Sequence, residues 1–308
     1  MNTTKSKLIL GFSVLALTAC GSTGGVKSTS KFDKAKYVST RTTKKLSKAT
    51  CPASAKSFNK QHRKQLLELG NACVQAKKWP MLEKIGSRLA KIDHSSPWGA
   101  YFLSIGSQGQ GNHTRALWMA DLALKKSPKL GFLHYQKGRV LWGMGEYETS
   151  VKSMNDALKY DKTLTDAHLF LGQIYYRDRD VKKAAKHFKG VLKTEPSNLA
   201  ALIGVAESYY QAKDNKDAIV YFEKAVDQAP SNLEIRFRLA DVYEKENQYG
   251  EALTTYRRIK RLMRSNKRKR STTGVNVAEK IEALEAMVAE QSPGRKVTRS
   301  EASERRAK

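Results

Sequence analysis

The chain has 308 residues, 40% of them hydrophobic, and a formal net charge of +28 from 57 basic and 29 acidic residues. This length allows one large domain or two small ones, and the apolar content excludes a chain too polar to build a core. The charge indicates a polyanionic partner. Inside a cytoplasm that would be nucleic acid, whereas outside the inner membrane it would be lipid head groups, lipopolysaccharide or cell-wall polymers.

Residues 1–19 have the features of a secretory signal peptide. Lys5 and Lys7 precede the apolar run "LILGFSVLAL", which is too short to cross a hydrocarbon core of about 30 Å as a helix. The letters "LTAC" that lead up to Cys20 resemble a bacterial lipobox. The resemblance implies cleavage before Cys20 and a diacylglycerol on its sulfur; an ordinary secreted protein with an unmodified cysteine is the alternative. Export also argues against nucleic acid as a partner.

Residues 20–57 begin with the glycine-rich "GSTGG" and continue with many Lys, Ser and Thr residues and few large apolar ones. This composition predicts a disordered, basic tether between the lipid and the folded part. Gly21 follows the lipobox cysteine in place of the aspartate that would signal inner-membrane retention. We therefore expect the protein in the bacterial cell envelope, lipid-anchored on the outer membrane and facing the periplasm, with surface display as an alternative.

Cys51 and Cys73 remain after lipidation of Cys20. An even pair can form a disulfide in an oxidising periplasm, provided that the segment around Cys51 folds back along the first predicted helix. The alternative is a free Cys51 beside a Cys73 that is buried as a small apolar residue.

A 34-residue period organises the middle of the chain. The stretch "LGQIYYRDRDVKKAAKHFKGVLKTEP" is followed one period later by "VAESYYQAKDNKDAIVYFEKAVDQAP", so that Tyr175 aligns with Tyr209 and Phe188 with Phe222. Small residues recur at the eighth and twentieth positions, where paired helices would approach closely, and Pro128, Pro196 and Pro230 close three of the units.

This spacing resembles that of tetratricopeptide repeats. The resemblance implies an all-α fold, a right-handed α-solenoid of six repeats within residues 58–266, starting near residues 63, 97, 131, 165, 199 and 233. Within 267–290, a basic loop precedes a capping helix with Val277, Ile281, Leu284 and Val288 on one face. Residues 291–308 are expected to be a disordered basic tail.

The resemblance also implies a concave groove lined by positions 2, 5, 9 and 12 of each repeat. The groove is expected to be aromatic in its first half and acidic at its far end, which suits an apolar helix or an extended segment with a basic group. The alternative is that the aromatic residues are core. The predicted groove residues are Trp98, Tyr101, Ile105, Phe132, Tyr135, Arg139, Trp142, Leu169, Gln173, Tyr176, Ile203, Glu207, Tyr210, Phe237 and Asp241.

Nothing in the sequence indicates an enzyme. The six histidines are scattered, and HExxH, GxSxG and Walker motifs are missing. His134 and His168 share position 4 of neighbouring repeats, a position that packs between helices in tetratricopeptide proteins, so we expect structural histidines. No catalytic residue, cofactor or metal is predicted.

A second candidate surface is strongly basic and could bind anionic lipid or a cell-wall polymer. Its residues are Arg257, Arg258, Lys260, Arg261, Arg264, Lys267, Arg268, Lys269 and Arg270. In architecture the chain resembles tetratricopeptide lipoproteins of pilus assembly, including type IV pilus pilotins. That resemblance implies a scaffold that binds another envelope protein and aids assembly of a pilus or secretin. The alternative function is polymer binding that coordinates peptidoglycan enzymes.

Overall fold

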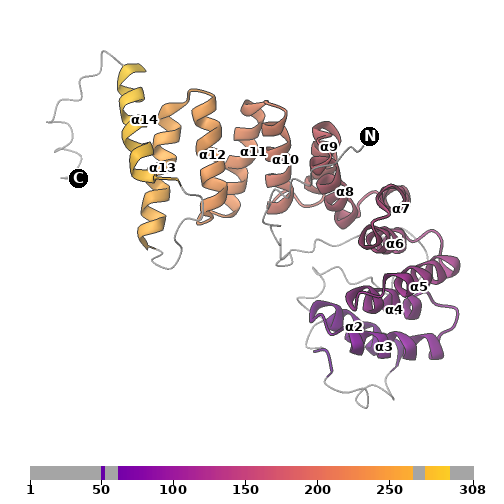
Figure 1. Cartoon of the computed structure of the whole chain (residues 1–308). Coiled ribbons are helices and arrows are strands. Elements are labelled where there is room, and N and C mark those ends of the chain that lie inside the picture. Colours follow the sequence, from indigo (N-terminus) through magenta and orange to yellow (C-terminus); the bar gives the residue numbers. More distant parts are fainter. Residues whose placement is uncertain (1–49, 53–61, 266–274, 292–308) are drawn as a thin grey trace, which may run out of the picture. The chain divides into compact units, whose positions relative to one another are not determined.

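The computed structural model describes residues 50–52, 62–265 and 275–291, and within these ranges every regular element is a helix (Figure 1). The predicted all-α fold is confirmed. The signal peptide, Cys20 and most of the tether lie outside the described residues, as do the C-terminal tail and the basic residues Lys267–Arg270. None of the described helices has the length and apolar character needed to cross a membrane.

The described chain consists of two compact units, and the boundary between them lies within α8 (Thr165–Arg177). Unit 1 contains the described residues up to Leu171 and Lys193–Glu195, and unit 2 contains the others. The helices before α8 are α2 (Arg63–Gln75), α3 (Trp79–Ile92), α4 (Trp98–Gly109), α5 (His113–Lys126), α6 (Gly131–Met144) and α7 (Tyr147–Tyr160). Those after it are α9 (Val181–Leu192), α10 (Leu199–Gln211), α11 (Asn215–Gln228), α12 (Leu233–Lys245), α13 (Tyr249–Ser265) and α14 (Val277–Gln291).

The helices begin where the 34-residue period places them. The first helix of each pair starts within one residue of 63, 97, 131, 165, 199 and 233. The "PSN" triplets at 196–198 and 230–232 show one cause. The Asn198 side chain accepts a hydrogen bond from the Ala201 N–H, and the Asn232 side chain accepts two from the next helix, so each asparagine caps the first turn.

The turn inside each helix pair adopts the left-handed backbone conformation at one repeated position. Gly111 and Gly145 have φ values of 81° and 85° there. The equivalent residues of the other repeats are not glycine, and they keep the same conformation. These residues are Lys77, Arg179, Lys213 and Asn247, with φ values of 54° to 62°. A non-glycine residue in this region carries a cost of about 1 kcal/mol, so packing of the helix pair must hold the turn.

In unit 1, small residues let neighbouring helices approach closely, both within a pair and between successive pairs. A Cβ added to Gly70 would lie 2.6 Å from the buried Phe102 ring, so only glycine fits. Where serine replaces glycine or alanine, its hydroxyl bonds to the partner helix. Ser104 Oγ donates to the Ala116 carbonyl at 2.9 Å, and Ser150 Oγ donates to the Gly138 carbonyl at 2.7 Å. The buried hydroxyls are therefore satisfied.

In unit 2, one aromatic ring fills the space between successive helices. The Phe188 ring of α9 packs against both Gly172 of α8 and Gly204 of α10, where an added Cβ would come within 2.8 Å of it. At the C-terminal end α14 packs on α13, as Figure 1 shows. Val277, Ile281 and Leu284 are buried there, and Val288 is half-buried against the same core. The last helix thus covers the apolar end of unit 2.

Candidate functional site

The predicted groove positions of unit 1 bring aromatic rings together across neighbouring repeats. Trp98 of α4 stacks on Phe132 of α6, with ring centroids 5.2 Å apart, and Tyr101 meets the same Phe132 edge-on at 5.1 Å. All three side chains are half-buried. Trp98 and Tyr101 are three residues apart, so both rings stand on one face of α4.

A second group of rings continues along α6. Trp142 meets the Phe170 ring of α8 edge-on at 5.5 Å, and Tyr135 meets Phe170 at 6.5 Å. The exposed Tyr147 lies 4.5 Å from Trp142, and the Arg139 guanidinium lies over the Tyr135 ring at 5.8 Å. We call the rings of Trp98, Tyr101, Phe132, Tyr135, Trp142 and Phe170 the ring cluster.

Two members of this site were missed in the sequence. Phe170 occupies the sixth repeat position and Tyr147 begins a second helix, and neither place belongs to the groove positions of the family. The signal for Phe170 was available, because on a helix it lies one turn after the second position of the same repeat, which is a groove position. No sequence pattern marks Tyr147.

Two predicted groove residues are wrong, because both side chains belong to the core. Ile105 is 6% exposed and packs with Leu66, Leu82 and Phe102 in the core of the first two repeats. Phe237 is 8% exposed and meets the Tyr256 ring edge-on at 6.2 Å. Burying these large apolar side chains against neighbouring helices is favourable, so they belong to the core and not to a solvent-facing groove.

The remaining predicted positions on α8, α10 and α12 are at least partly accessible. Gln173 is exposed, and the others are half-buried: Leu169, Tyr176, Ile203, Glu207, Tyr210 and Asp241. Leu169 belongs to unit 1 and the others to unit 2.

In unit 2, phenols and carboxylates form a repeated pair between successive first helices. Tyr176 Oη donates to Glu207 at 3.3 Å, and one repeat later Tyr210 Oη donates to Asp241 at 2.5 Å. Burial, together with the charge of Glu207, raises the pKa of Tyr176 from 10.0 to about 12. Burial also raises the pKa of Glu207 although the Arg238 guanidinium lowers it.

The expected acidic end of the groove is largely neutralised. Glu207 forms an ion pair with Arg238 at 3.2 Å, and Asp241 forms one with Lys245 at 3.2 Å. The expectation that this end selects a basic group is therefore not supported, because each of these carboxylates already has a cation. The two cations, Arg238 and Lys245, lie outside the groove positions of the repeat, so those positions alone overstate the negative charge.

The two histidines at position 4 lie within hydrogen-bonding distance of backbone carbonyl oxygens in the loops before their helices. His134 Nε2 lies 2.8 Å from the Pro128 carbonyl oxygen, and His168 Nε2 lies 3.3 Å from the Lys162 carbonyl oxygen. In the sixth repeat Arg236 replaces histidine and donates two hydrogen bonds to a loop carbonyl six residues earlier. Burial lowers the pKa of His168. In the described ranges no three His, Cys, Asp or Glu side chains gather as metal ligands.

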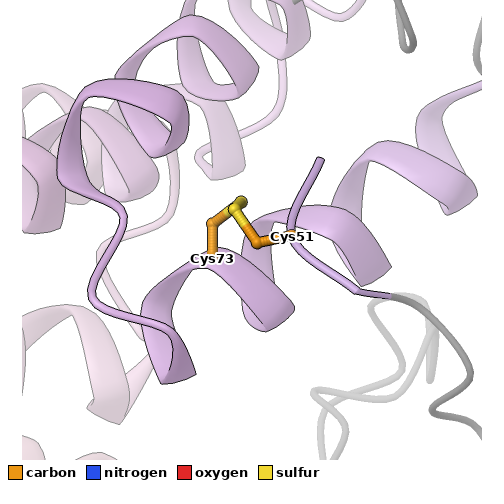
Figure 2. Close-up of a disulfide and its surroundings, with 2 residues drawn as sticks. All are labelled: Cys51 and Cys73. Atoms are coloured by element: carbon orange, nitrogen blue, oxygen red, sulfur yellow. A yellow bond between two sulfur atoms is a disulfide. The ribbon is translucent and has the colours of Figure 1, made fainter. Parts of the chain in front are cut away.

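Cys51 and Cys73 form a disulfide with a Cα–Cα distance of 4.6 Å (Figure 2). Of the two alternatives for these cysteines, the structure has the bonded one. Cys73 is fully buried among Leu66, Leu82 and Ile85, and Cys51 packs half-buried on the same core. The bond therefore fastens the segment before α2 to the first helix pair.

Comparison with known proteins identifies the repeat. Family models described as tetratricopeptide repeat match residues 135–198, 172–232 and 209–268. Residues 135–268 carry tetratricopeptide repeats. Ahead of them, α2 to α5 continue the same pattern of helix pairs in the structure. No curated protein sequence matches the chain.

Solved tetratricopeptide structures share the fold at low sequence identity. The C-terminal part of a tetratricopeptide-repeat protein from Cytophaga hutchinsonii is 12% identical over 74% of this chain and 95% of that one, with a TM-score of 0.55. A double mutant of MamA from strain RS-1 is 20% identical over 54% of this chain and 94% of that one, with a TM-score of 0.50. A chain of the APC/C complex Cut9–Hcn1 is 13% identical over 75% of this chain and 45% of that one, with a TM-score of 0.51.

Proposed function

We propose that this protein is a lipid-anchored scaffold of the bacterial cell envelope and that the ring cluster binds a segment of another envelope protein. The observation that carries the proposal is the ring cluster itself. Five of its six rings stand at the repeat positions that face the concave side in the tetratricopeptide family, and all six are half-buried. Large, partly exposed aromatic side chains are frequent anchors of protein interfaces, and tetratricopeptide scaffolds are suited to protein–protein interaction.

The anchor in this proposal is a lipid on Cys20, because "LTAC" resembles a lipobox and "GSTGG" provides a flexible start for the tether. Gly21 favours the outer membrane, facing the periplasm. A scaffold held there suits assembly or localisation of an envelope complex such as a pilus or a secretin. Metabolic labelling with a fatty acid tests the anchor, since Cys20→Ala should abolish the label and leave unprocessed precursor. An unlabelled wild type would remove the lipid from the proposal.

The ring cluster is tested by site-specific photocrosslinking in intact cells. A photoreactive amino acid in place of Tyr135 should give a discrete protein adduct. The matched control replaces Trp118, an aromatic residue of α5 outside the groove positions that is 63% exposed. Equal adducts from both positions, or none from Tyr135, would contradict the proposal.

A second candidate function is binding of an anionic cell-wall polymer that coordinates peptidoglycan enzymes. It is favoured by the exposed side chains of Arg257, Arg258, Arg261 and Arg264 on α13. Ionic strength separates the two functions. Binding through these cations should weaken steeply with added salt, whereas binding through rings should change little.

A further inference from the structure

The C-terminal half of α13 carries an unusual stripe of positive charge. The stripe consists of Arg257, Lys260, Arg261 and Arg264. Lys260 and Arg261 lie three or four residues from both Arg257 and Arg264, so the four side chains stand on one side of the helix. Like charges at these spacings destabilise a helix. The helix dipole favours cations in the last turn, which accounts for Arg264 but not for Arg257 or Lys260, which lie further from the helix end.

The stripe lines a shallow depression that is largely open to solvent. Its four basic side chains form one wall of a pocket of about 400 Å³ between α13 and α14, and Ile281 and Glu285 of α14 form the other. We call this the basic pocket. It lies wholly within unit 2.

The charge of the basic pocket is not balanced by the described residues. Arg257 Nη2 donates to Glu285 at 2.8 Å, while no described carboxylate forms an ion pair with Lys260, Arg261 or Arg264. Four basic side chains against one carboxylate leave a net charge of +3. The neighbouring carboxylate of Glu244 does not balance the pocket either, because it forms an ion pair with Lys280 of α14 at 2.7 Å.

We propose that the basic pocket binds a phosphate group, either in an anionic phospholipid head group or in a free phosphate compound. Three neighbouring cations without acidic partners match the several oxygens of a phosphate, and arginine can contact two of them at once. The buried Ile281 gives the pocket an apolar wall beside the cations, which favours the lipid source. The proposal is independent of the ring cluster and of the partner that it binds.

The test uses the full chain in a non-ionic detergent at an ionic strength of about 0.15 M, where exposed charges are screened beyond roughly 8 Å. Native mass spectrometry measures binding of phosphatidic acid and of phosphatidylcholine, and thermal melting measures the effect of inorganic pyrophosphate. The pocket variant is Lys260→Gln with Arg264→Gln. The control variant, Lys182→Gln with Lys186→Gln on α9, removes two exposed charges at the same spacing.

We expect phosphatidic acid to bind the wild type more tightly than phosphatidylcholine does, and the pocket variant to lose at least about tenfold in affinity while the control variant does not. Without ligand, the pocket variant should melt no lower than the wild type, because three of the four repulsive pairs within the stripe are removed. Stabilisation by pyrophosphate together with lipid binding would identify a general phosphate site, and lipid binding alone would identify a head-group site. Equal losses in both variants, or no binding of either probe to the wild type, would overturn the proposal.

Discussion

The disulfide between Cys51 and Cys73 allows a quantitative prediction about local stability. The two residues are 22 apart in sequence, so the bond closes a loop of about that length in the unfolded chain. For such a loop the chain-entropy model gives a stabilisation of about 3 kcal/mol. In a repeat protein each unit contacts mainly its neighbours, so this stabilisation should be concentrated in α2 and α3 and should hardly reach α12.

Hydrogen exchange measures this directly. In Cys51→Ser, amide protection in α2 should fall by about two orders of magnitude, since about 1.4 kcal/mol corresponds to a factor of ten. Protection in α12 should not change. Serine keeps the size of the side chain, so the loss reports the bond rather than a cavity.

The control is chemical reduction. A reductant should lower α2 protection in the wild type to the level of Cys51→Ser and should leave the variant unchanged. If reduction leaves α2 protection in the wild type as it was, the reasoning from loop closure is refuted. If protection falls equally in α2 and α12, the assumption of local coupling between neighbouring repeats is wrong.

Three further predictions concern the repeats themselves. Phe188→Ala should cost about 3–5 kcal/mol in a denaturant titration, because this buried ring fills the space between two glycines; a loss below about 1 kcal/mol would contradict the packing described. Lys213→Gly should stabilise by about 0.5–1 kcal/mol because φ is 62° there, and Gly145→Ala, at φ 85°, should destabilise by a similar amount. The folded state holds the Tyr176 proton to about pH 12 while the unfolded chain releases it near 10, so stability should fall as the pH rises through that window. An NMR titration of the Tyr176 ring should show this pKa, and Glu207→Gln should lower it.

The repeat made most of the fold predictable from the sequence. A 34-residue period and small residues at two positions each have a physical cause in helix packing, so helix starts could be placed within one residue. The left-handed turns were not predictable in the same way. Gly111, Gly145 and, more weakly, Asn247 carry a sequence signal for them, whereas Lys213 is held there by the packing of its helix pair.

The candidate site was less predictable because repeat positions do not fix which way a side chain turns. Ile105 and Phe237 occupy groove positions but are apolar and have core space beside them, so they are buried. The net charge around Glu207 depends on Arg238 of the next repeat, and that around Asp241 on Lys245 one turn later. Neither cation is at a groove position, so the groove positions alone do not predict the charge. Phe170 joins the ring cluster from a position outside that list.

The central claim, that the ring cluster binds a partner, is tested most directly by comparing two tryptophan variants. Trp142 on α6 and Trp79 on α3 are both half-buried, and only Trp142 belongs to the ring cluster. Trp142 also makes two ring contacts, each worth about 0.5–1.5 kcal/mol, so Trp142→Ala should lower the melting temperature moderately. The measurement is the yield of the Tyr135 crosslink in each background at equal protein level. We predict that Trp142→Ala reduces the yield by more than about tenfold, since hot-spot rings contribute about 2 kcal/mol or more, and that Trp79→Ala leaves it unchanged. Equal yields in the two variants would contradict the claim.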